Sequence, residues 1–410
     1  MAEREDVVIV GGGIGGLTLA LLLHERGISC RVFEAVEKVT QVGVGITILP
    51  HAARELSQLG LLDELRRRCL ETEDSVFYNR FGQFVFAEPA GRNAGYAWPQ
   101  LSIHRADLYE VLLEAARARL GEGAITFGAR FLEASSDEGS AAARLLVGDE
   151  ERRVTANVLI GCDGVHSALR RQLYPDEGEP LYQGLNMWRG VTRFPPFLSG
   201  ASMLRVGWYT SGKLTVYPCR PADEHGEQLM NWIAARETPH HLERDWGRAG
   251  KLEDFIGTFT DWHFDFLDVP ALFERAERIL EYPMVDQEPV DRWTFGRLTL
   301  LGDAAHPMAP RGSNGAAQAI LDCRALADEL AATPDREAAL HAYEARRRPA
   351  TAAIVYKNRA DPPDAILREV CLRTGDRPFE RLEDVIGAEE LASLSEGYKQ
   401  VTGYSQRALT

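Results

Sequence analysis

The sequence lacks several features that would each have assigned the protein to a different class. No uninterrupted apolar stretch approaches the roughly 18 residues of a membrane span, and no basic segment leads into an apolar one near the N-terminus. The 46 Lys and Arg are outnumbered by 61 Asp and Glu, for a net charge of −15, so we expect no nucleic-acid partner. The six cysteines form no CxxC pair or zinc-like spacing, which predicts reduced thiols and no metal site. Together these absences predict a cytoplasmic protein that does not bind membranes.

The N-terminal segment of the 410-residue chain carries a dinucleotide-binding pattern. A β-branched run at residues 7–10 precedes a glycine turn, a helix is predicted to about residue 26, and a strand at residues 29–33 ends in an acid. In this pattern the glycines make the turn, admit a pyrophosphate and let helix and strand pack, and the acid accepts from the ribose. The residues predicted to bind the nucleotide are Gly11, Gly13, Ile14, Gly15, Gly16, Glu34 and Ala35.

A second glycine-rich turn occupies residues 297–322, far along the chain. An apolar run at residues 298–301 predicts a buried strand, and an Ala-rich pattern predicts a helix from Ala316 to Leu330. Asp303 stands at the carboxyl end of the strand, where α/β sheets bind ligands, and the glycines of the loop let backbone approach closely. N–H groups at the start of the helix favour an anion or an electron-rich ring edge.

With a third segment, residues 158–170 around Asp163-Gly164, these turns resemble, in their order, the motifs of the single-component FAD-dependent aromatic hydroxylases. Within that family the resemblance is greatest to the phenazine-pathway branch, in which decarboxylative hydroxylation yields pyocyanin. It implies that Asp303 binds the FAD ribityl chain, that Asp163 serves FAD and NAD(P)H binding, and that a loop lies against the isoalloxazine ring. The loop residues given this catalytic position are Pro310 and Gly312.

The same resemblance implies further cofactor contacts. They are Val44, Gly45, Ile46, Arg105, the strand residue Phe131, Gly312, Ser313, Asn314 and Gly315. The loop departs from the commoner family pattern Gly-x-Gln-Gly-x-Asn, because it reads Gly-Ser-Asn-Gly-Ala-Ala from residue 312. Two alternatives stay open: residues 42–46 can be a plain surface turn, and Arg105 can form a salt bridge with Asp107. His306 is predicted to fix the loop in place and not to shuttle protons.

Residues 181–282 differ in character, with short alternating strands and many aromatic residues in place of glycine-rich turns. Five of the seven Trp lie here, namely Trp188, Trp208, Trp232, Trp246 and Trp262, and collectively they suit a flat aromatic guest. The candidates for substrate contact are Trp188, Arg189, Trp208, Tyr209 and Tyr217. For any one aromatic the alternative is a place in the core, and for Arg189 it is a structural ion pair.

We therefore predict an α/β fold, a Rossmann-like FAD-binding domain with an inserted antiparallel-sheet substrate domain. The FAD-binding domain is expected at residues 1–74, 100–180 and 283–355, the substrate domain at 75–99 and 181–282, and a C-terminal helical segment at 356–410. One helix is expected over residues 50–68, and another over residues 338–348, stopped by Pro349.

The predicted function is that of an FAD-dependent monooxygenase. It would use NAD(P)H and O2 to hydroxylate a planar aromatic or heteroaromatic small molecule through a flavin C4a-hydroperoxide, with decarboxylation of an aromatic acid as one variant. The alternatives are an FAD oxidase or dehydrogenase without oxygen insertion, and a non-catalytic FAD-binding redox sensor. The protein is expected to be a monomer or a homodimer.

Overall fold

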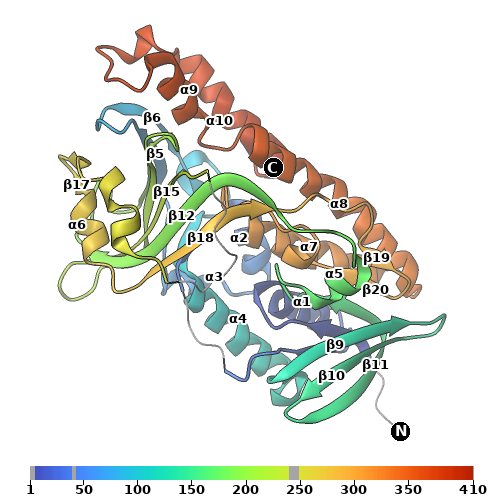
Figure 1. Ribbon diagram of the computed structural model, residues 1–410. Coiled ribbons are helices and arrows are strands. Elements are labelled where there is room, and N and C mark those ends of the chain that lie inside the picture. Colours follow the sequence, from blue (N-terminus) through green and yellow to red (C-terminus); the bar gives the residue numbers. More distant parts are fainter. Residues whose placement is uncertain (1–4, 39–42, 240–248, 410) are drawn as a thin grey trace.

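The computed structural model describes residues 5–38, 43–239 and 249–409, which fold around two large sheets (Figure 1). The first sheet has the strand order β19-β20-β11-β1-β2-β8, and β10 and β9 extend from β11 as antiparallel strands. The central pairs β1–β2, β1–β11 and β11–β20 are parallel. The strands are β1 (Glu5–Val10), β2 (Cys30–Phe33), β8 (Ile125–Thr126), β9 (Ala129–Ser136), β10 (Ala141–Val147), β11 (Glu150–Gly161), β19 (Thr294–Phe295) and β20 (Leu298–Leu300).

The centre of this sheet is buried on both faces. All four residues of the apolar run Val7–Val10 in β1 are buried, as expected for a parallel strand covered by helices. Helix α1 (Ile14–Glu25) follows β1 directly and packs against α4 (Arg105–Leu120) and α7 (Asn314–Ala332). The glycine turn between β1 and α1 is thereby fixed at the carboxyl edge of the sheet.

The second sheet has the order β18-β12-β15-β14-β13-β5-β6. Its neighbouring strands are antiparallel, with one parallel pair, β5–β13. The strands are β5 (Asp74–Tyr78), β6 (Phe84–Pro89), β12 (Leu181–Phe194), β13 (Ser202–Gly207), β14 (Lys213–Arg220), β15 (Gln228–Glu237) and β18 (Ile279–Asp286). The mixed α/β architecture agrees with the predicted fold class, although β18 continues past residue 282, where the inserted part was expected to end.

Both faces of the second sheet are apolar. On one face, Trp188, Trp232 and Phe273 belong to a core cluster that includes α6 (Val269–Glu274). On the other face, Met187, Tyr209 and neighbouring side chains form a separate cluster that includes Ala309 of the glycine-rich loop. The sheet therefore separates a closed core from the side that meets the first sheet.

Shorter elements connect the two sheets. A three-stranded sheet is formed by β3 (Gly45–Ile48), β7 (Leu101–His104) and β4 (Cys69–Glu71), and a two-stranded one by β16 (His263–Phe264) and β17 (Leu267–Asp268). The single helix expected over residues 50–68 is two helices, α2 (Pro50–Gln58) and α3 (Leu62–Arg66). Gly60, at φ +70°, ends α2, and the Leu61 N–H donates to the Leu56 carbonyl, so a left-handed cap interrupts the apolar pattern.

The C-terminal part of the chain is helical and runs along one side of the molecule, from the first sheet to the edge strands β5 and β6 of the second (Figure 1). It comprises α8 (Arg336–Ala360), α9 (Ala365–Thr374), α10 (Ala388–Thr402) and α11 (Gln406–Leu409). The remaining short elements are α5 (Ala168–Leu173) and the 3-10 turns η1 (Gly91–Ala94), η2 (Glu122–Ala124), η3 (Leu252–Asp254), η4 (Ile256–Thr258), η5 (Gly302–Ala304) and η6 (Leu382–Asp384).

The expectation that Pro349 stops a helix was wrong, because α8 continues through it. Proline removes one N–H donor, a cost of about 3 kcal/mol in a helix interior. Side chains on both sides of it, Tyr343 before and Ile354 after, are buried, so tertiary packing offsets the loss. The Thr351 hydroxyl donates to carbonyls in the turn before it, at 3.2 and 3.3 Å. No described helix is long and apolar enough to cross a membrane.

Candidate active site

A cleft opens where β1, β11 and β20 reach their carboxyl ends. This is the edge at which α/β sheets bind ligands. The structure brings most of the predicted cofactor residues to its wall. Those that line it are Gly13, Ile14, Gly15, Val44, Gly45, Ile46, Arg105, Asp303, Pro310, Ser313, Asn314 and Gly315.

The glycines after β1 are required by close backbone approaches. A Cβ on Gly11, which has φ +102°, would lie 2.3 Å from the Cys162 carbonyl oxygen at the end of β11. A Cβ on Gly16 would lie 1.9 Å from the Gly11 oxygen. Gly13 has no atom within 4 Å of such a Cβ, so the space beside it is open to a ligand. The close approaches at Gly11 and Gly16 and the open space at Gly13 leave room for the roles that the pattern predicts.

Glu34, Ala35 and Phe131 lie beyond the residues that line the cleft, on the side of β2 and β9. The Glu34 carboxylate accepts from the backbone N–H groups of Gly12 (2.6 Å) and Val36 (3.0 Å), which orient it beside the glycine turn. Ala35 is exposed, and Phe131 is buried within β9. These hydrogen bonds hold the carboxylate beside the glycine turn, where the sequence pattern predicts the ribose of a nucleotide.

Asp163 ties the turn after β11 to the start of α5. One carboxylate oxygen accepts from the N–H groups of Ala168 (2.7 Å) and Leu169 (3.2 Å), whereas the other is buried without a partner among the described residues. Burial raises the pKa of this carboxyl, and the hydrogen bonds to Ser167 and to backbone oppose that rise. An unpartnered buried oxygen at this place is a free acceptor for a ligand or its water.

Arg170 connects two of the sequence motifs, a role that the sequence did not reveal. Its guanidinium donates to the carbonyls of Ala304 (3.0 Å) and Ala305 (2.7 Å), which belong to and follow η5. It also pairs with Glu177. The turn after β11 is therefore fixed to the turn that carries Asp303.

Arg105 begins α4 at the mouth of the cleft. The alternative of a salt bridge to Asp107 does not hold, because Asp107 accepts from Nε and Nη2 of Arg220, each at 2.6 Å. Arg105 is exposed and has no ion pair within the described part of the chain. Its charge is available to an anionic group in the cleft.

The loop before α7 presents backbone toward the cleft. Gly312 (φ +66°) and Ser313 (φ +58°) are consecutive left-handed residues, and for Ser313 this conformation is uncommon. No side chain caps the start of α7, so the first N–H groups of that helix have no partner within it. Asp303 and Pro310 are exposed on the same side. This arrangement provides donors for an electron-rich group.

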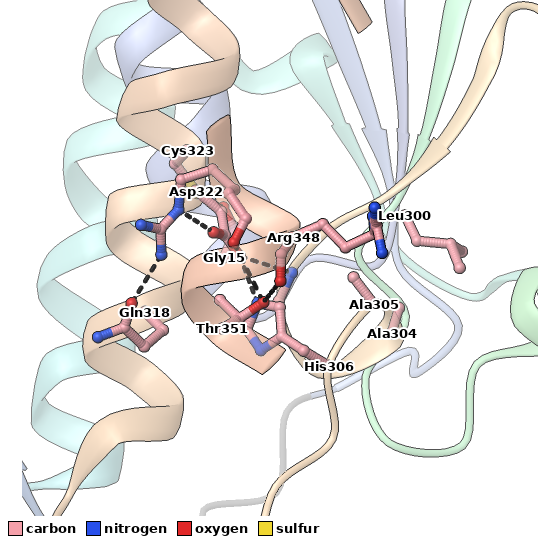
Figure 2. A network of polar contacts seen from close by, with 12 residues as sticks. Gly15, Leu300, Ala304, Ala305, His306, Gln318, Asp322, Cys323, Arg348 and Thr351 are labelled. Atoms are coloured by element: carbon pink, nitrogen blue, oxygen red, sulfur yellow. Dashed lines mark hydrogen bonds and ion pairs between the residues drawn. The ribbon is translucent and has the colours of Figure 1, made fainter. Parts of the chain in front are cut away.

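His306 has the structural role that was expected. Its Nε2 lies 2.5 Å from Asp322, and Figure 2 shows this contact at the base of α7. Arg347 donates to the same carboxylate (2.6 Å) and to Gln318 (2.6 Å). Burial raises the Asp322 pKa, but His306 and Arg347 outweigh this and hold it below its usual range. The network fixes η5 to α7 and α8 from behind the cleft.

A second, inner cavity lies between the second sheet and the loop at residues 310–313. It shares Tyr217, Ile233, Pro310 and Ser313 with the cleft, so the two spaces meet. Gly312 and Tyr209 line the inner cavity as well. The structure thus brings the predicted residues Tyr209 and Tyr217 beside the predicted flavin loop.

The predicted substrate residues Trp208 and Trp188 line neither the cleft nor the inner cavity. Trp208 packs against Tyr209, with ring centroids 4.7 Å apart, and lines an outer pocket at the surface. Trp188 stacks on Phe255, with ring centroids 5.1 Å apart, in the closed core on the opposite face of the sheet, so it is not part of the site. Trp232 and Trp262 belong to the same core, and Trp246 lies outside the described residues.

Arg189 was expected either to contact the substrate or to form a structural ion pair, and in the structure it bonds to backbone. Its Nη2 donates to the Gly45 carbonyl at 2.8 Å, and no ion pair to it is found among the described residues. The Gly45 N–H in turn donates to the Asn231 side chain at 2.7 Å. Arg189 lines the cleft beside these residues and holds strand β3, through Gly45, against the second sheet. The segment at 43–46 is therefore more than a surface turn.

Several residues of the inner cavity were missed from the sequence. They are Met187, Met203, Arg205, Lys213, Met284, Arg311 and Asp364. Asp364 lies on the C-terminal segment, far from any recognised motif. No local signal identifies it, because its place depends on how α9 docks against β13 and β14.

Comparison with known proteins agrees with this geometry. A family model for an FAD binding domain matches residues 4–239 and 269–358. The chain belongs to this family. Phenazine 1,6-dicarboxylic acid hydroxylase PhzS of Lysobacter antibioticus is 42% identical to it over 370 residues, which cover 87% of this chain and 90% of that one. The predicted family is thereby confirmed, and the protein is an FAD-dependent aromatic monooxygenase.

Two further likenesses cover nearly the whole monooxygenase. 3-Amino-4-hydroxybenzoate 2-monooxygenase PtmB3 of Streptomyces platensis is 32% identical over 391 residues, 92% of this chain and 94% of its own length. The crystal structure of HpxO from Klebsiella pneumoniae, complexed with FAD and uric acid, superposes with a TM-score of 0.75 at 21% identity. That match covers 99% of this chain and 97% of the other, and it shows the shared fold.

The residues of the cleft fit FAD on structural grounds. The space beside Gly13 is open, one oxygen of Asp163 is buried without a partner, and α1 and α7 both begin without a side-chain cap. Such N-termini accept phosphate or an electron-rich ring edge. The monooxygenase would hold FAD with the glycine turn, Asp303, Arg105 and the loop at residues 310–315.

Proposed function

We propose that this monooxygenase hydroxylates a planar heteroaromatic acid of the phenazine carboxylate type, with O2 as oxidant and NAD(P)H as electron donor. The observation that carries the proposal is the wall common to the cleft and the inner cavity, which includes Tyr217, Pro310 and Ser313. A ring held in the inner cavity lies directly against the site that fits FAD. Holding the substrate ring close to the cofactor is the main contribution that the protein makes to the reaction.

The lining of the inner cavity suits a flat ring. Three of the chain's six methionines, Met187, Met203 and Met284, lie on its walls together with Tyr217 and Ile233. Thioethers are polarizable and make favourable contacts with aromatic rings. An apolar wall also keeps water from the reacting atoms.

The cavity supports an acid as substrate better than a phenol. A phenol would require a side chain that accepts its proton, but no histidine lines the described walls of the inner cavity. Its one carboxylate among the described residues is Asp364. Burial alone would raise the pKa of this carboxyl, but the positive charges of Lys213 and Arg205 outweigh burial and hold the pKa below its usual range. A carboxylate with a lowered pKa is a poor base. An acid needs no such base to become an anion.

Bound FAD supplies the redox chemistry, including the activation of oxygen. The residues of this chain bind, orient and shield. N–H groups of the loop at residues 310–315 stabilise negative charge at the ring edge that they face. The Tyr217 hydroxyl stays protonated at neutral pH, because burial raises its pKa to about 12, and it can donate a hydrogen bond to an oxygen of the substrate. Asp163 is proposed to serve NAD(P)H as well as FAD.

The proposal also covers the division of the chain, its location and its oligomeric state. The division into an FAD-binding part, an inserted substrate-binding part and a C-terminal segment follows the two sheets and the helices beside them. Six unpaired cysteines and the use of NAD(P)H support a cytoplasmic location. We propose a monomer or a homodimer, and hydroxylation at the carbon that bears the carboxylate, with loss of CO2, as one form of the reaction.

The test is oxidation of NADH and NADPH by the FAD-loaded protein in the presence of phenazine carboxylates, aminohydroxybenzoates and phenols. Oxygen uptake, peroxide, CO2 and the mass of the product are followed together. We expect a phenazine carboxylate to speed oxidation and to gain an oxygen atom. Fast oxidation with all oxygen recovered as peroxide for every compound would favour an oxidase. Stable FAD binding without stimulated oxidation would favour a redox sensor.

A further inference from the structure

The polar end of the inner cavity is a buried ion cluster formed by parts of the chain that are distant in sequence. Arg205 of β13 and Lys213 of β14 both pair with Asp364, which precedes α9. The Arg205 Nε lies 3.1 Å from Asp364 Oδ1, and Lys213 contacts the other carboxylate oxygen. Only 12%, 8% and 4% of the side-chain surfaces of Arg205, Lys213 and Asp364 are exposed. We call these three residues the inner ion cluster.

The charges of the cavity do not balance. Besides the inner ion cluster, Arg311 lines the same walls, so three cations share one carboxylate. Arg311 donates to the Asn358 carbonyl (2.8 Å) and lies over the Tyr209 ring, and neither partner carries a charge. No other carboxylate pairs with these cations within the described part of the chain. Arg205 and Lys213 are largely buried and Arg311 is half-buried, and cations that are short of counter-ions are costly to remove from water, so the cavity favours an anion.

The geometry of Asp364 indicates more than a helix cap. It occupies the N-cap position of α9, where an aspartate commonly accepts from the first turn of the helix, yet its side chain makes no capping hydrogen bond. The carboxylate instead faces the cavity and the two cations. Lys213 is further positioned by the Tyr209 hydroxyl at 3.2 Å. The cations are therefore held in place with part of their hydrogen-bonding capacity unused.

We propose that Lys213 and Arg205 bind the carboxylate of the aromatic substrate, and that Asp364 holds both cations in position for it. This inference rests on the proposed function and adds the site that recognises the acid. The apolar walls formed by Met187, Met203 and Met284 place the ring, and the inner ion cluster selects rings that carry an anionic group. The C-terminal segment thereby contributes to substrate choice through one residue.

The test measures binding and needs no turnover. The FAD-loaded protein is titrated with phenazine-1-carboxylate and with phenazine-1-carboxamide, a neutral analogue of the same shape, without NAD(P)H. We expect the natural protein to bind the acid at least about tenfold more tightly than the amide, as a charge-assisted hydrogen bond provides. In Lys213→Met the acid should weaken by about tenfold or more, while the amide is unchanged.

Two further variants separate recognition from folding. Lys213→Arg keeps the charge and should keep the preference for the acid. Asp364→Asn keeps an oxygen acceptor that can hold both cations in position but removes the negative charge that competes for them, so the acid should bind about as tightly as before or several-fold more tightly, although the protein unfolds at lower temperature. A purely structural role of the cluster predicts the opposite, a parallel loss of affinity for acid and amide. Lys357→Met is the matched control, since Lys357 also pairs with an aspartate, Asp361, but lines neither cavity.

Each outcome is decisive. A preference for the acid that disappears in Lys213→Met and persists in Lys357→Met supports the inference. Equal affinity of the natural protein for acid and amide, absence of binding of both, or a preference untouched by Lys213→Met would overturn it. Failure of the proposed function appears in a different measurement, since no compound would then stimulate NAD(P)H oxidation even where the acid binds.

Discussion

The flavin cleft and the inner cavity share a wall but are built from different parts of the chain. The cleft is formed largely by backbone at turns that follow β1, β11 and β20, and each turn lies within a short stretch of sequence. The inner cavity is formed by side chains of the second sheet, the loop at residues 310–313 and Asp364. A cofactor common to many enzymes is bound by backbone geometry, whereas a particular substrate is selected by side chains that the fold assembles.

The cleft and the inner cavity also differ in where their charged groups lie. The cleft has open N–H groups and exposed Arg105 at its mouth, which suit a phosphate-bearing ligand. The inner cavity has buried, partly paired cations among methionines. Changes in the first region should therefore affect cofactor retention, and changes in the second should affect substrate preference. The predictions below test this separation, beginning with the largest effect.

Gly13→Ala should nearly abolish FAD binding without harming the fold. The residue has φ −75° and ψ −167°, which alanine adopts readily, and no protein atom lies within 4 Å of the added Cβ. The methyl group projects into the space that we assign to the cofactor, so we expect FAD affinity to fall by about 100-fold or more. Thermal unfolding of the apoprotein and fluorescence titration with FAD measure the two effects. Gly123→Ala, equally free of neighbours but away from the cleft, is the control.

Gly16→Ala provides the contrast within the same turn. Its Cβ would lie 1.9 Å from a backbone oxygen, so this variant should lose stability as well as FAD. If Gly13→Ala bound FAD normally, or lost as much stability as Gly16→Ala, the cleft would not be the cofactor site that we describe.

Tyr398→Phe should loosen the wall between the two regions. The buried Tyr398 hydroxyl accepts from the Asn314 amide and donates to the Asn358 side chain, both at 2.7 Å. Its removal leaves polar groups unsatisfied beside the loop, a cost of about 1–3 kcal/mol. We expect an altered flavin absorption spectrum and a several-fold rise in the fraction of oxygen released as peroxide, since water reaches the cleft.

Tyr343→Phe is the matched control for this prediction. Tyr343 is also buried and donates to a backbone carbonyl, that of Leu300 at 3.1 Å, but it does not touch the loop. This variant should lose stability with unchanged peroxide release. Equal release in both variants would show that Tyr398 stabilises the fold in general and not the loop.

Met187 and Trp188 test the two faces of one strand. Met187→Ala should raise KM for the aromatic substrate by several-fold, because it removes a wall of the inner cavity. Trp188→Phe should leave KM unchanged and lower the free energy of unfolding by about 1–3 kcal/mol, because it opens space in the closed core. Steady-state kinetics and urea unfolding of both variants measure these effects. A change in KM in Trp188→Phe as large as that in Met187→Ala would show that Trp188 is part of the substrate site.

The same two residues show why the cleft was predictable and the cavity was not. The glycine turn, the acid at Glu34 and the strand before Asp303 are local patterns with a fixed backbone geometry, so sequence order sufficed to place them. In β12, alternation separates Met187 from Trp188 but does not say which face meets the ligand, since both faces of this sheet are apolar. Asp364 carries no pattern at all. The prediction that Pro349 ends a helix was wrong for a related reason, because the packing of α8 offsets the local preference of proline against a helix interior.

The smallest effect at neutral pH concerns His51, which lies behind α7 between Gln318 (3.5 Å) and the Tyr404 ring (5.6 Å between centroids). Burial, aided by Arg347 and Arg54, lowers its pKa from 6.5 to about 3. Below pH 6.5 the unfolded chain binds a proton at His51, whereas the native protein binds this proton only below about pH 3. The stability due to neutral His51 is complete above pH 6.5 and falls by about 1.4 kcal/mol per pH unit below it. His51→Gln should therefore lose about 3 kcal/mol less than the natural protein between pH 6.5 and pH 4 in urea unfolding, whereas parallel losses would show that His51 titrates normally.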